Sequence, residues 1–447
     1  MERIKVSENC RFLITESGKP FFWLGDTAWE LFHRCTREQV KIYLENRHKK
    51  GINVIQTVAL AELDGLHTPN MYGETPLHDD DPTQPNEAYF DLVDFGIRTA
   101  ASYDIYIALL PTWADKVTHM WGVGPRVFNP ENARTYGRWL GERYGEDTNV
   151  LWVLGGDRPA FIESYDYRPI WREMAAGIDE GCGFSPFKTY HPMGGYSSSA
   201  WLRDEPWLDM NMIQSGHGGG RDNRIAWEQI SHDYNLTPIK PTLDGEPNYE
   251  DHAVNPWPKW DPANGYFRDE DVRKQTYRSV FAGGCGVTYG HHFIWQMYAE
   301  NRQAMNNGNE LMPWHLAIDR PGVSQMIHLK NLMLSRPYLN RIPCQELIIS
   351  DPGEGKDHIQ ATRDLEGRYA FVYIPRAGQT VELDMNLLQS PLQAFWYDPR
   401  DGHVKSVGEF STKGPIPFTS PTTNPDWVLV LDAVRENFPS PGKCYDE

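Results

Sequence analysis

The stretch NVLWVLGGDRP, residues 149–159, begins as a continuous apolar run and ends in two glycines, a carboxylate and a guanidinium. A strand that is apolar on both faces is typical of a parallel sheet covered by helices. Seven further stretches of this kind alternate with amphipathic helical segments, at residues 20–27, 53–60, 105–111, 187–192, 208–217, 238–247 and 286–293. Eight such strands predict an α/β fold, a closed (β/α)8 TIM barrel with a short N-terminal β extension, over residues 1–340. An open doubly wound sheet is the weaker alternative, because no Gly-x-Gly-x-x-Gly follows the first strand.

The pattern changes after the last barrel helix. Short strands separated by turn residues are predicted at residues 346–350, 358–364, 369–375, 380–385, 392–399 and 426–432. This spacing predicts a small antiparallel β-sandwich at residues 344–440. The N-terminal segment, residues 4–20, is expected either to add strands to this sandwich or to close the bottom of the barrel.

The composition excludes several classes of partner. Lys and Arg total 43 against 61 Asp and Glu, a formal charge of −18. This charge argues against nucleic acid and anionic membranes, and no apolar run is long enough for membrane insertion. Six scattered cysteines are expected to be mainly buried thiols. The sequence as it stands predicts a cytoplasmic protein, or a periplasmic or secreted one if a leader has been trimmed. It specifies no oligomeric state.

Polar and aromatic residues recur where the predicted barrel strands end. Active sites of (β/α)8 barrels lie at this end, so these residues are candidates for one pocket. With 16 Trp in the chain, several near predicted loops, a sugar-binding site is expected, because flat aromatic rings stack on sugars. The predicted substrate-binding residues are Asp26, Trp29, Trp113, Arg158, His191, Gln214, Tyr289, His292 and Trp295. Other strand-end candidates are Gln56, Glu62, Asp115, His217, Asp244 and His291.

Two carboxylates stand out, Asp157 after the fourth strand and Glu246 after the seventh. In a closed barrel they face each other across the mouth, which suits cleavage of a glycosidic bond by a carboxyl pair. A separation of about 5 to 5.5 Å would mean retention, and about 6.5 to 9.5 Å inversion. Three alternatives stay open: Asp157 and Arg158 form a structural ion pair, Asp244 replaces Glu246, or Asp26 only caps the next segment.

Metal and cofactor chemistry is not expected. His291 and His292 are adjacent, so in a strand they point to opposite faces, and His292 is the one expected to face the pocket. There is no His-Glu-x-x-His helix and no dense cluster of Asp and His. No Gly-x-Ser-x-Gly motif supports a serine nucleophile. No cofactor is therefore predicted, and a metal-dependent hydrolase ranks third among the hypotheses.

Five stretches in order carry a family resemblance: residues 18–58, LLPTWADK at 109–116, VLWVLGGDRP at 150–159, TLDGEPNYE at 242–250 and GVTYGHHFIWQM at 286–297. Together they resemble the apiosidase-like proteins of glycoside hydrolase family 140. The C-terminal segment resembles the β-sandwich of these proteins, which is called a collagen-binding domain. The resemblance implies a retaining glycosidase, with LGGD placing the acid/base at Asp157 and DGEP placing the nucleophile at Glu246. It implies release of apiose from the pectin rhamnogalacturonan-II. Related retaining barrels carry Asn-Glu where this chain has Gly-Asp, which weakens the analogy to cellulases.

The leading hypothesis is an exo-acting, retaining glycoside hydrolase whose partner is a carbohydrate, an apiose-like terminal sugar on a plant pectic oligosaccharide. The alternative is a non-catalytic carbohydrate-binding or adhesive protein. Release of sugar from oligosaccharides distinguishes the two.

Overall fold

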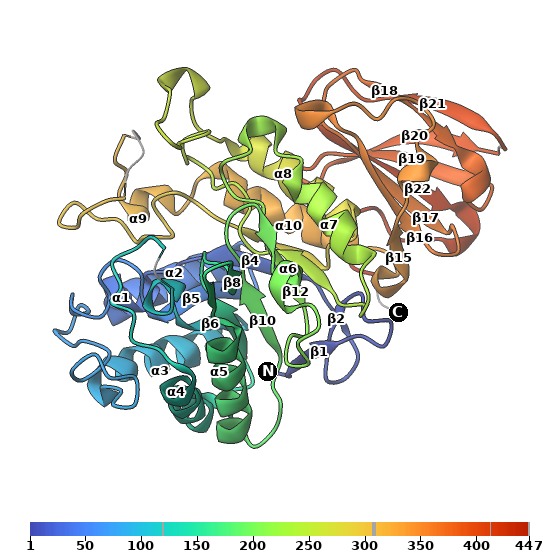
Figure 1. Ribbon diagram of the computed structural model, residues 1–447. Coiled ribbons are helices and arrows are strands. Elements are labelled where there is room, and N and C mark those ends of the chain that lie inside the picture. The colour runs from blue at the N-terminus through green and yellow to red at the C-terminus, as the bar shows by residue number, and fades with distance from the viewer. Residues whose placement is uncertain (119, 306–309, 412, 446–447) are drawn as a thin grey trace.

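The computed structural model describes residues 1–118, 120–305, 310–411 and 413–445 of the chain. Figure 1 shows a larger body of alternating strands and helices, beside which an all-β body stands at the red, C-terminal end of the colour range. These bodies are the α/β barrel and the antiparallel sandwich that the strand patterns predict.

The barrel wall consists of eight parallel strands, and every residue in them is buried, which explains the apolar runs of the longer strands. They are β4 (Trp23–Thr27), β5 (Val54–Leu60), β6 (Tyr106–Thr112), β7 (Val150–Gly155), β10 (Lys188–His191), β12 (Asn211–Gln214), β13 (Thr242–Asp244) and β14 (Gly286–Tyr289). Their order in the sheet is β10-β7-β6-β5-β4-β14-β13-β12, after which the short antiparallel strand β11 (Tyr196–Ser197) follows. A parallel bridge between Thr189 of β10 and Met210, just before β12, joins the two ends of the row. The eight strands therefore form a closed ring.

Helices connect the strands and cover the outside of the ring (Figure 1). Thr36 is the N-cap of the helix over Arg37–Lys49: its hydroxyl accepts from the Gln39 amide, and the Gln39 side chain accepts from the Thr36 amide. Among the described residues, no helix is both long and apolar enough to cross a lipid bilayer. The helices are α1 (Leu31–Arg34), α2 (Arg37–Lys49), α3 (Glu87–Ser102), α4 (Pro130–Tyr144), α5 (Arg168–Cys182), α6 (Ser199–Leu202), α7 (Ile225–Tyr234), α8 (Asp269–Phe281), α9 (Trp314–Ala317) and α10 (Pro321–Met333).

The N-terminal segment forms a small three-stranded sheet of β1 (Ile4–Val6), β2 (Leu13–Thr15) and β3 (Pro20–Phe21). Tyr106, the first residue of β6, donates its hydroxyl to the Glu2 carbonyl at 2.6 Å. Thr148, just before β7, donates to the Met1 carbonyl at 2.8 Å. Both contacts lie at the amino ends of barrel strands. Of the two expected places, the segment therefore occupies the bottom of the barrel, away from the strand ends that carry the candidate site residues.

The sandwich has a six-stranded and a two-stranded sheet around one apolar core. Its strands are β15 (Arg341–Pro343), β16 (Gln360–Asp364), β17 (Tyr369–Ile374), β18 (Thr380–Asp384), β19 (Leu392–Tyr397), β20 (Val404–Phe410), β21 (Pro415–Thr419) and β22 (Trp427–Ala433). The prediction of a strand at residues 346–350 is wrong. Residues 345–347 form a 3-10 turn, and Ile348 alone bridges to Leu383. The sequence did not reveal β20 and β21, because β20 lies at a sheet edge and has no fully buried residue, and because β21 contains two prolines.

Strand β17 connects the two bodies through its alternating side chains. Tyr369, Phe371 and Tyr373 belong to the same apolar core as the barrel helices. The residues between them, Ala370, Val372 and Ile374, belong to the core of the sandwich. Since successive strand residues point to opposite faces, β17 is buried on both sides and reads as one apolar run.

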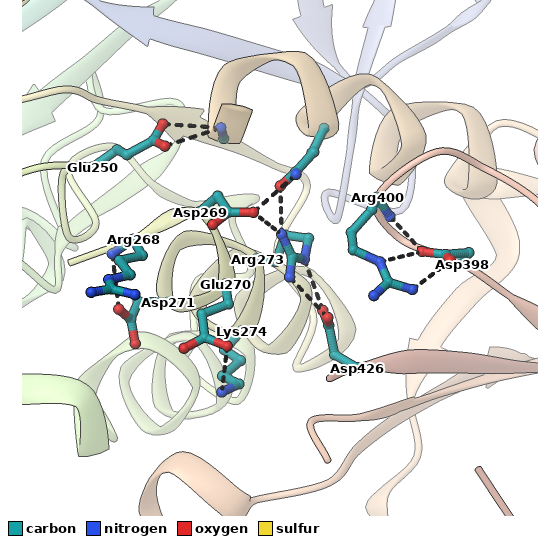
Figure 2. A network of polar contacts seen from close by, with 12 residues as sticks. Glu250, Arg268, Asp269, Glu270, Asp271, Arg273, Lys274, Asp398, Arg400 and Asp426 are labelled. Carbon is teal, nitrogen blue, oxygen red and sulfur yellow. Dashed lines mark hydrogen bonds and ion pairs between the residues drawn. The ribbon is translucent and has the colours of Figure 1, made fainter. Parts of the chain in front are cut away.

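A buried ion pair reinforces this interface. Arg273 of α8 donates from Nε and Nη2 to the two carboxylate oxygens of Asp426, each at 2.9 Å, and Tyr373 donates its hydroxyl to the same carboxylate at 2.9 Å. Figure 2 shows Arg273 between Asp426 and Asp269, to which Nη1 donates at 2.7 Å. The sandwich is thus fixed against the barrel by apolar packing and by a bidentate pair.

Candidate active site

A cavity of about 760 Å³ opens at the carboxyl ends of the barrel strands. The segments that follow all eight strands contribute to its wall, so the cavity is surrounded on every side. It is lined by Trp29, Glu62, Trp113, Trp121, Asp157, Met193, Gly194, Gly195, Gln214, Ser215, Gly216, His217, Gly218, Gly219, Ile225, Glu246, Tyr249, His252, Trp257, His292, Trp295 and Met305. The predicted pocket therefore exists, and both predicted catalytic carboxylates, Asp157 and Glu246, face into it.

Asp157 is brought into the cavity by a left-handed turn at the end of β7. The φ angles of Gly155, Gly156 and Asp157 are +87°, +127° and +53°. A Cβ on Gly155 would lie 2.4 Å from the His191 carbonyl, and one on Gly156 would lie 2.8 Å from the Trp113 ring. The two glycines are thus required both for the turn and for the space. Aspartate tolerates a positive φ better than most residues that carry a side chain, so Asp157 can follow the two glycines in this turn.

Among the residues that the structure describes, two side chains contact the Asp157 carboxylate, both at Oδ2. Arg158 lies with Nη1 at 2.9 Å, and Trp121 donates from Nε1 at 3.1 Å. The Asp157–Arg158 ion pair that sequence reasoning kept as an alternative is therefore present. It does not remove Asp157 from the cavity, because the Asp157 side chain stays 24 % exposed whereas that of Arg158 is fully buried.

Glu246 is held by the turn that follows β13. The amide of Gly245 donates to the Ile213 carbonyl at 2.9 Å, and the side chain of Gln56 donates to the Gly245 carbonyl at 2.8 Å. The amide of Gly216 donates to the carbonyl of Glu246 itself at 2.9 Å. The backbone on either side of Glu246 is therefore fixed by neighbouring strand ends.

Two histidines face the Glu246 carboxylate. His191 Nε2 lies 3.0 Å from Oε2, and His217 Nε2 lies 3.4 Å from Oε1. In each ring Nδ1 accepts a backbone N–H, from Asp157 at 3.2 Å for His191 and from Tyr249 at 3.3 Å for His217. A neutral ring whose Nδ1 accepts must carry its proton on Nε2. Both histidines thus present an N–H to Glu246.

The two cavity carboxyls have pKa shifts of opposite sign. Burial raises the pKa of Asp157, against the opposing effect of Arg158 and with support from the negative charge of Glu246. Burial also disfavours the charged form of Glu246, but the contacts with His191 and His217 outweigh burial and hold the pKa of Glu246 well below its usual range. One group is therefore suited to donate a proton while the other stays ionised.

Aromatic rings form much of the wall. Trp29 and Trp113 lie with ring centroids 5.1 Å apart, and each contacts the His191 ring, at 5.2 and 5.7 Å. Trp295 lines the cavity as well. All three tryptophans predicted to stack on sugar are thus placed at the cavity surface.

Several buried polar atoms of the wall have no protein partner within the described residues. They are Trp113 Nε1, Gln214 Oε1, Tyr249 Oη and both ring nitrogens of His292. Buried polar groups are normally hydrogen-bonded, and each unpaired one costs about 1 to 3 kcal/mol. A ligand rich in hydroxyl groups would supply the missing partners. Gln214 and His292 are among the predicted substrate-binding residues.

Four predicted substrate-binding residues do not line the cavity: Asp26, Arg158, His191 and Tyr289. Asp26 is buried, and its carboxylate accepts from Arg47 and Tyr43 of α2, so it neither faces a sugar nor only caps the next segment. Tyr289 donates its hydroxyl to Glu250 at 2.6 Å. The structure corrects the prediction that Asp26 and Tyr289 contact the substrate directly, because side chains far away in the sequence occupy their polar groups. Arg158 and His191 instead contact the two catalytic candidates.

The other strand-end candidates differ in whether their side chains reach the cavity. Asp244, the alternative to Glu246, is buried beneath the cavity and accepts from the Ser215 hydroxyl at 2.7 Å. His292 faces the cavity, whereas His291 contacts Asp251 at 3.1 Å. Glu62 lines the cavity, and burial raises its pKa to about 8.

Among the wall residues that sequence reasoning missed are Trp121, Tyr249, His252, Trp257 and Met305. All lie in long segments beyond the strand ends, where the strand-end rule gives no position. The aromatic character of Trp121 and Trp257 was the available signal. Among the described residues, no group of three or more His, Cys, Asp or Glu side chains is arranged to hold a metal ion.

Comparisons with known proteins agree with this geometry. Residues 7–340 match the family model described as "Apiosidase-like, catalytic domain", and residues 342–432 match "Putative collagen-binding domain of a collagenase". No curated protein matches the chain. A solved structure titled "Glycoside hydrolase" is 32 % identical with a TM-score of 0.86, and the alignment covers 97 % of each chain. A glycoside hydrolase family 5 structure from Bacteroides vulgatus is also 32 % identical, with a TM-score of 0.85 over 97 % of this chain and 93 % of that one.

The matched catalytic family covers the whole barrel and every cavity residue described above. The two solved relatives extend the likeness through the sandwich. A closed barrel with a carboxyl pair in an aromatic cavity agrees with the activity that these names give. The chain therefore belongs to the apiosidase-like family of glycoside hydrolases.

Proposed function

We propose that this glycoside hydrolase is retaining and exo-acting, and that it removes an apiose-like terminal sugar from a plant pectic oligosaccharide by double displacement. The observation that carries the proposal is the carboxyl pair Asp157 and Glu246, which share one cavity and have pKa shifts of opposite sign. The family match supports the apiose-like sugar.

In the first step the ionised Glu246 attacks the anomeric carbon, while Asp157 gives its proton to the departing oxygen. The negative charge of Glu246 raises the pKa of Asp157, and this charge disappears once Glu246 is esterified. Asp157 then becomes a stronger acid, and therefore exists as the carboxylate that deprotonates the attacking water. The water oxygen bonds to the anomeric carbon, Glu246 leaves, and both carboxyls return to their starting states.

Exo action is supported by the shape of the cavity. Segments after all eight strands contribute to its wall, which favours a pocket that takes the end of a sugar chain over a groove that is open at both ends. A volume of about 760 Å³ lies within the range of about 300 to 1,000 Å³ of small-ligand pockets. Trp29, Trp113 and Trp295 would stack on the bound sugar, and Gln214 and His292 would hydrogen-bond its hydroxyls.

The test is a screen of the intact protein against aryl glycosides and pectic oligosaccharides. We expect release of a terminal sugar by the wild type and loss of turnover in Glu246→Gln, with Glu163→Gln, an exposed glutamate outside the cavity, as the matched control. Binding without any product from the wild type would contradict the proposal and favour the non-catalytic, carbohydrate-binding alternative.

A further inference from the structure

Trp121 stands beside the acid/base candidate and remains open to solvent. Its side chain is part of the cavity wall, and the residue is 41 % exposed. An exposed tryptophan at the mouth of a pocket is a binding feature rather than core packing, because its ring gains little burial in the free protein.

The position of this ring is fixed by Arg158. The guanidinium donates from Nε and Nη2 to the Trp121 carbonyl at 3.2 and 2.7 Å, and it lies 4.2 Å from the centroid of the indole. The next residue, Gly122, has a φ of +101°, and a Cβ there would lie 2.6 Å from Asp115 Cβ and 2.9 Å from Arg158 Nη2. The turn therefore needs glycine, and one face of the indole is already covered by a cation.

The indole N–H is directed at the carboxylate of Asp157. Nε1 donates to Oδ2 at 3.1 Å, the same oxygen that Arg158 contacts at 2.9 Å. Within the described part of the chain, no hydrogen-bond donor contacts Oδ1. Protonation of Asp157 is thus directed to Oδ1, the oxygen that no described donor contacts.

We propose that Trp121 forms the leaving-group side of the site: its open face stacks on the sugar that departs, and its N–H holds Oδ2 of Asp157 so that Oδ1 donates the proton. The inference rests on the proposed function of Asp157. A general acid lies within hydrogen-bond reach of the leaving oxygen, so a ring bonded to the acid lies beside the leaving sugar.

The charged groups around Asp157 also affect its pKa, so the effect of the Trp121 N–H is considered together with theirs. Arg158 favours the ionised form, His191 acts in the same sense, and Glu246 disfavours it. Glu62 is a further carboxyl in the same wall. The Trp121 N–H stabilises the ionised form, so its removal raises the pKa of Asp157.

Two variants separate the two roles. Trp121→Phe keeps a ring but loses the N–H: the alkaline limb of the kcat/KM profile is expected to move to higher pH, with little change in KM. Trp121→Ala loses both, and KM for an oligosaccharide is expected to rise roughly three- to tenfold as well. The control is Trp257→Phe, because Trp257 is another exposed cavity tryptophan and its ring lies against His217 and His252; this variant should leave the alkaline limb in place.

Calorimetry gives a readout that does not need turnover. In the Glu246→Gln background, Trp121→Ala should weaken binding of the oligosaccharide but not of the free terminal sugar, which lies on the other side of the scissile bond. Equal binding of the oligosaccharide with and without Trp121, or an unmoved alkaline limb in an active and folded Trp121→Phe protein, would overturn the proposal. If the wild type binds the oligosaccharide but releases no sugar, the proposed function fails, while calorimetry still decides the stacking role of Trp121.

Discussion

His191 links the two cavity carboxylates: its Nδ1 accepts the backbone N–H of Asp157 at 3.2 Å, and its Nε2 lies 3.0 Å from Glu246. One imidazole thereby fixes the turn that carries the acid/base candidate and directs an N–H at the nucleophile candidate. The residue is fully buried, so we assign it the role of positioning Glu246 rather than of contacting sugar.

Replacement of His191 by Ala should raise the pKa of Glu246, because a donor to the charged form is lost. The acidic limb of the kcat/KM profile is expected to move to higher pH, and kcat to fall. His217→Ala should shift the limb in the same direction but less, since its contact is longer, 3.4 Å against 3.0 Å. A pH–rate series on both variants checks this, and an acidic limb that stays in place in His191→Ala would contradict the role.

The Asp157→Asn variant should lose activity according to the leaving group. Without the acid, we expect turnover of oligosaccharides to fall by roughly 10²- to 10⁴-fold. Aryl glycosides with strongly acidic phenols need no proton in the first step, so that step should be much less affected. Initial rates across a series of phenols provide the measurement. A uniform loss for all leaving groups would assign Asp157 a role in binding instead.

Glu62 should make stability depend on pH. Burial raises its pKa to about 8 in the folded protein, whereas an unfolded glutamate titrates near 4.5. Protonated Glu62 therefore stabilises the folded state fully below the unfolded pKa of 4.5, and this stabilisation is lost as the pH rises through the folded pKa of about 8. Glu62→Gln cannot ionise, so its free energy of unfolding relative to wild type should rise between pH 4.5 and 8. Urea unfolding at several pH values tests this, and a constant difference would contradict it.

Loss of Arg273 should weaken the attachment of the sandwich to the barrel. Removing one partner of a buried pair leaves Asp426 uncompensated and typically costs about 3 to 5 kcal/mol. Arg273→Ala is therefore expected to lower the melting temperature clearly in differential scanning calorimetry. Arg224→Ala is the matched control, because its pair with Glu228 is exposed and worth at most about 1 kcal/mol. Equal melting temperatures for the two variants would count against this view of the interface.

The barrel could be predicted because its strands are buried on both faces. An apolar run such as residues 150–155 needs no knowledge of the partner strand to be recognised. Strand β20 could not be predicted, since an exposed edge strand carries no such run. The strand that was expected at 346–350 has apolar residues but turns at residues 345–347 instead.

The residues of the candidate site likewise fall into some that the sequence predicts and some that it does not. Asp157, Glu246, Gln214 and the three predicted tryptophans follow barrel strands closely, so the rule that sites lie at strand ends locates them. Trp121 and Trp257 lie in long segments whose path depends on tertiary contacts, such as those of Arg158. The pairing of Asp26 with Arg47 could not be predicted either, because it joins a strand to a helix through two side chains that are 21 positions apart in the sequence.

The central claim is that Glu246 is the nucleophile of a double displacement. In Asp157→Asn the second step lacks its base, so an activated aryl glycoside that the wild type hydrolyses should form a glycosyl-enzyme that accumulates. Mass spectrometry of the intact protein should show the added mass of one sugar residue, and peptide mapping should place it on Glu246. An unmodified protein after turnover, or a sugar attached elsewhere, would contradict the claim.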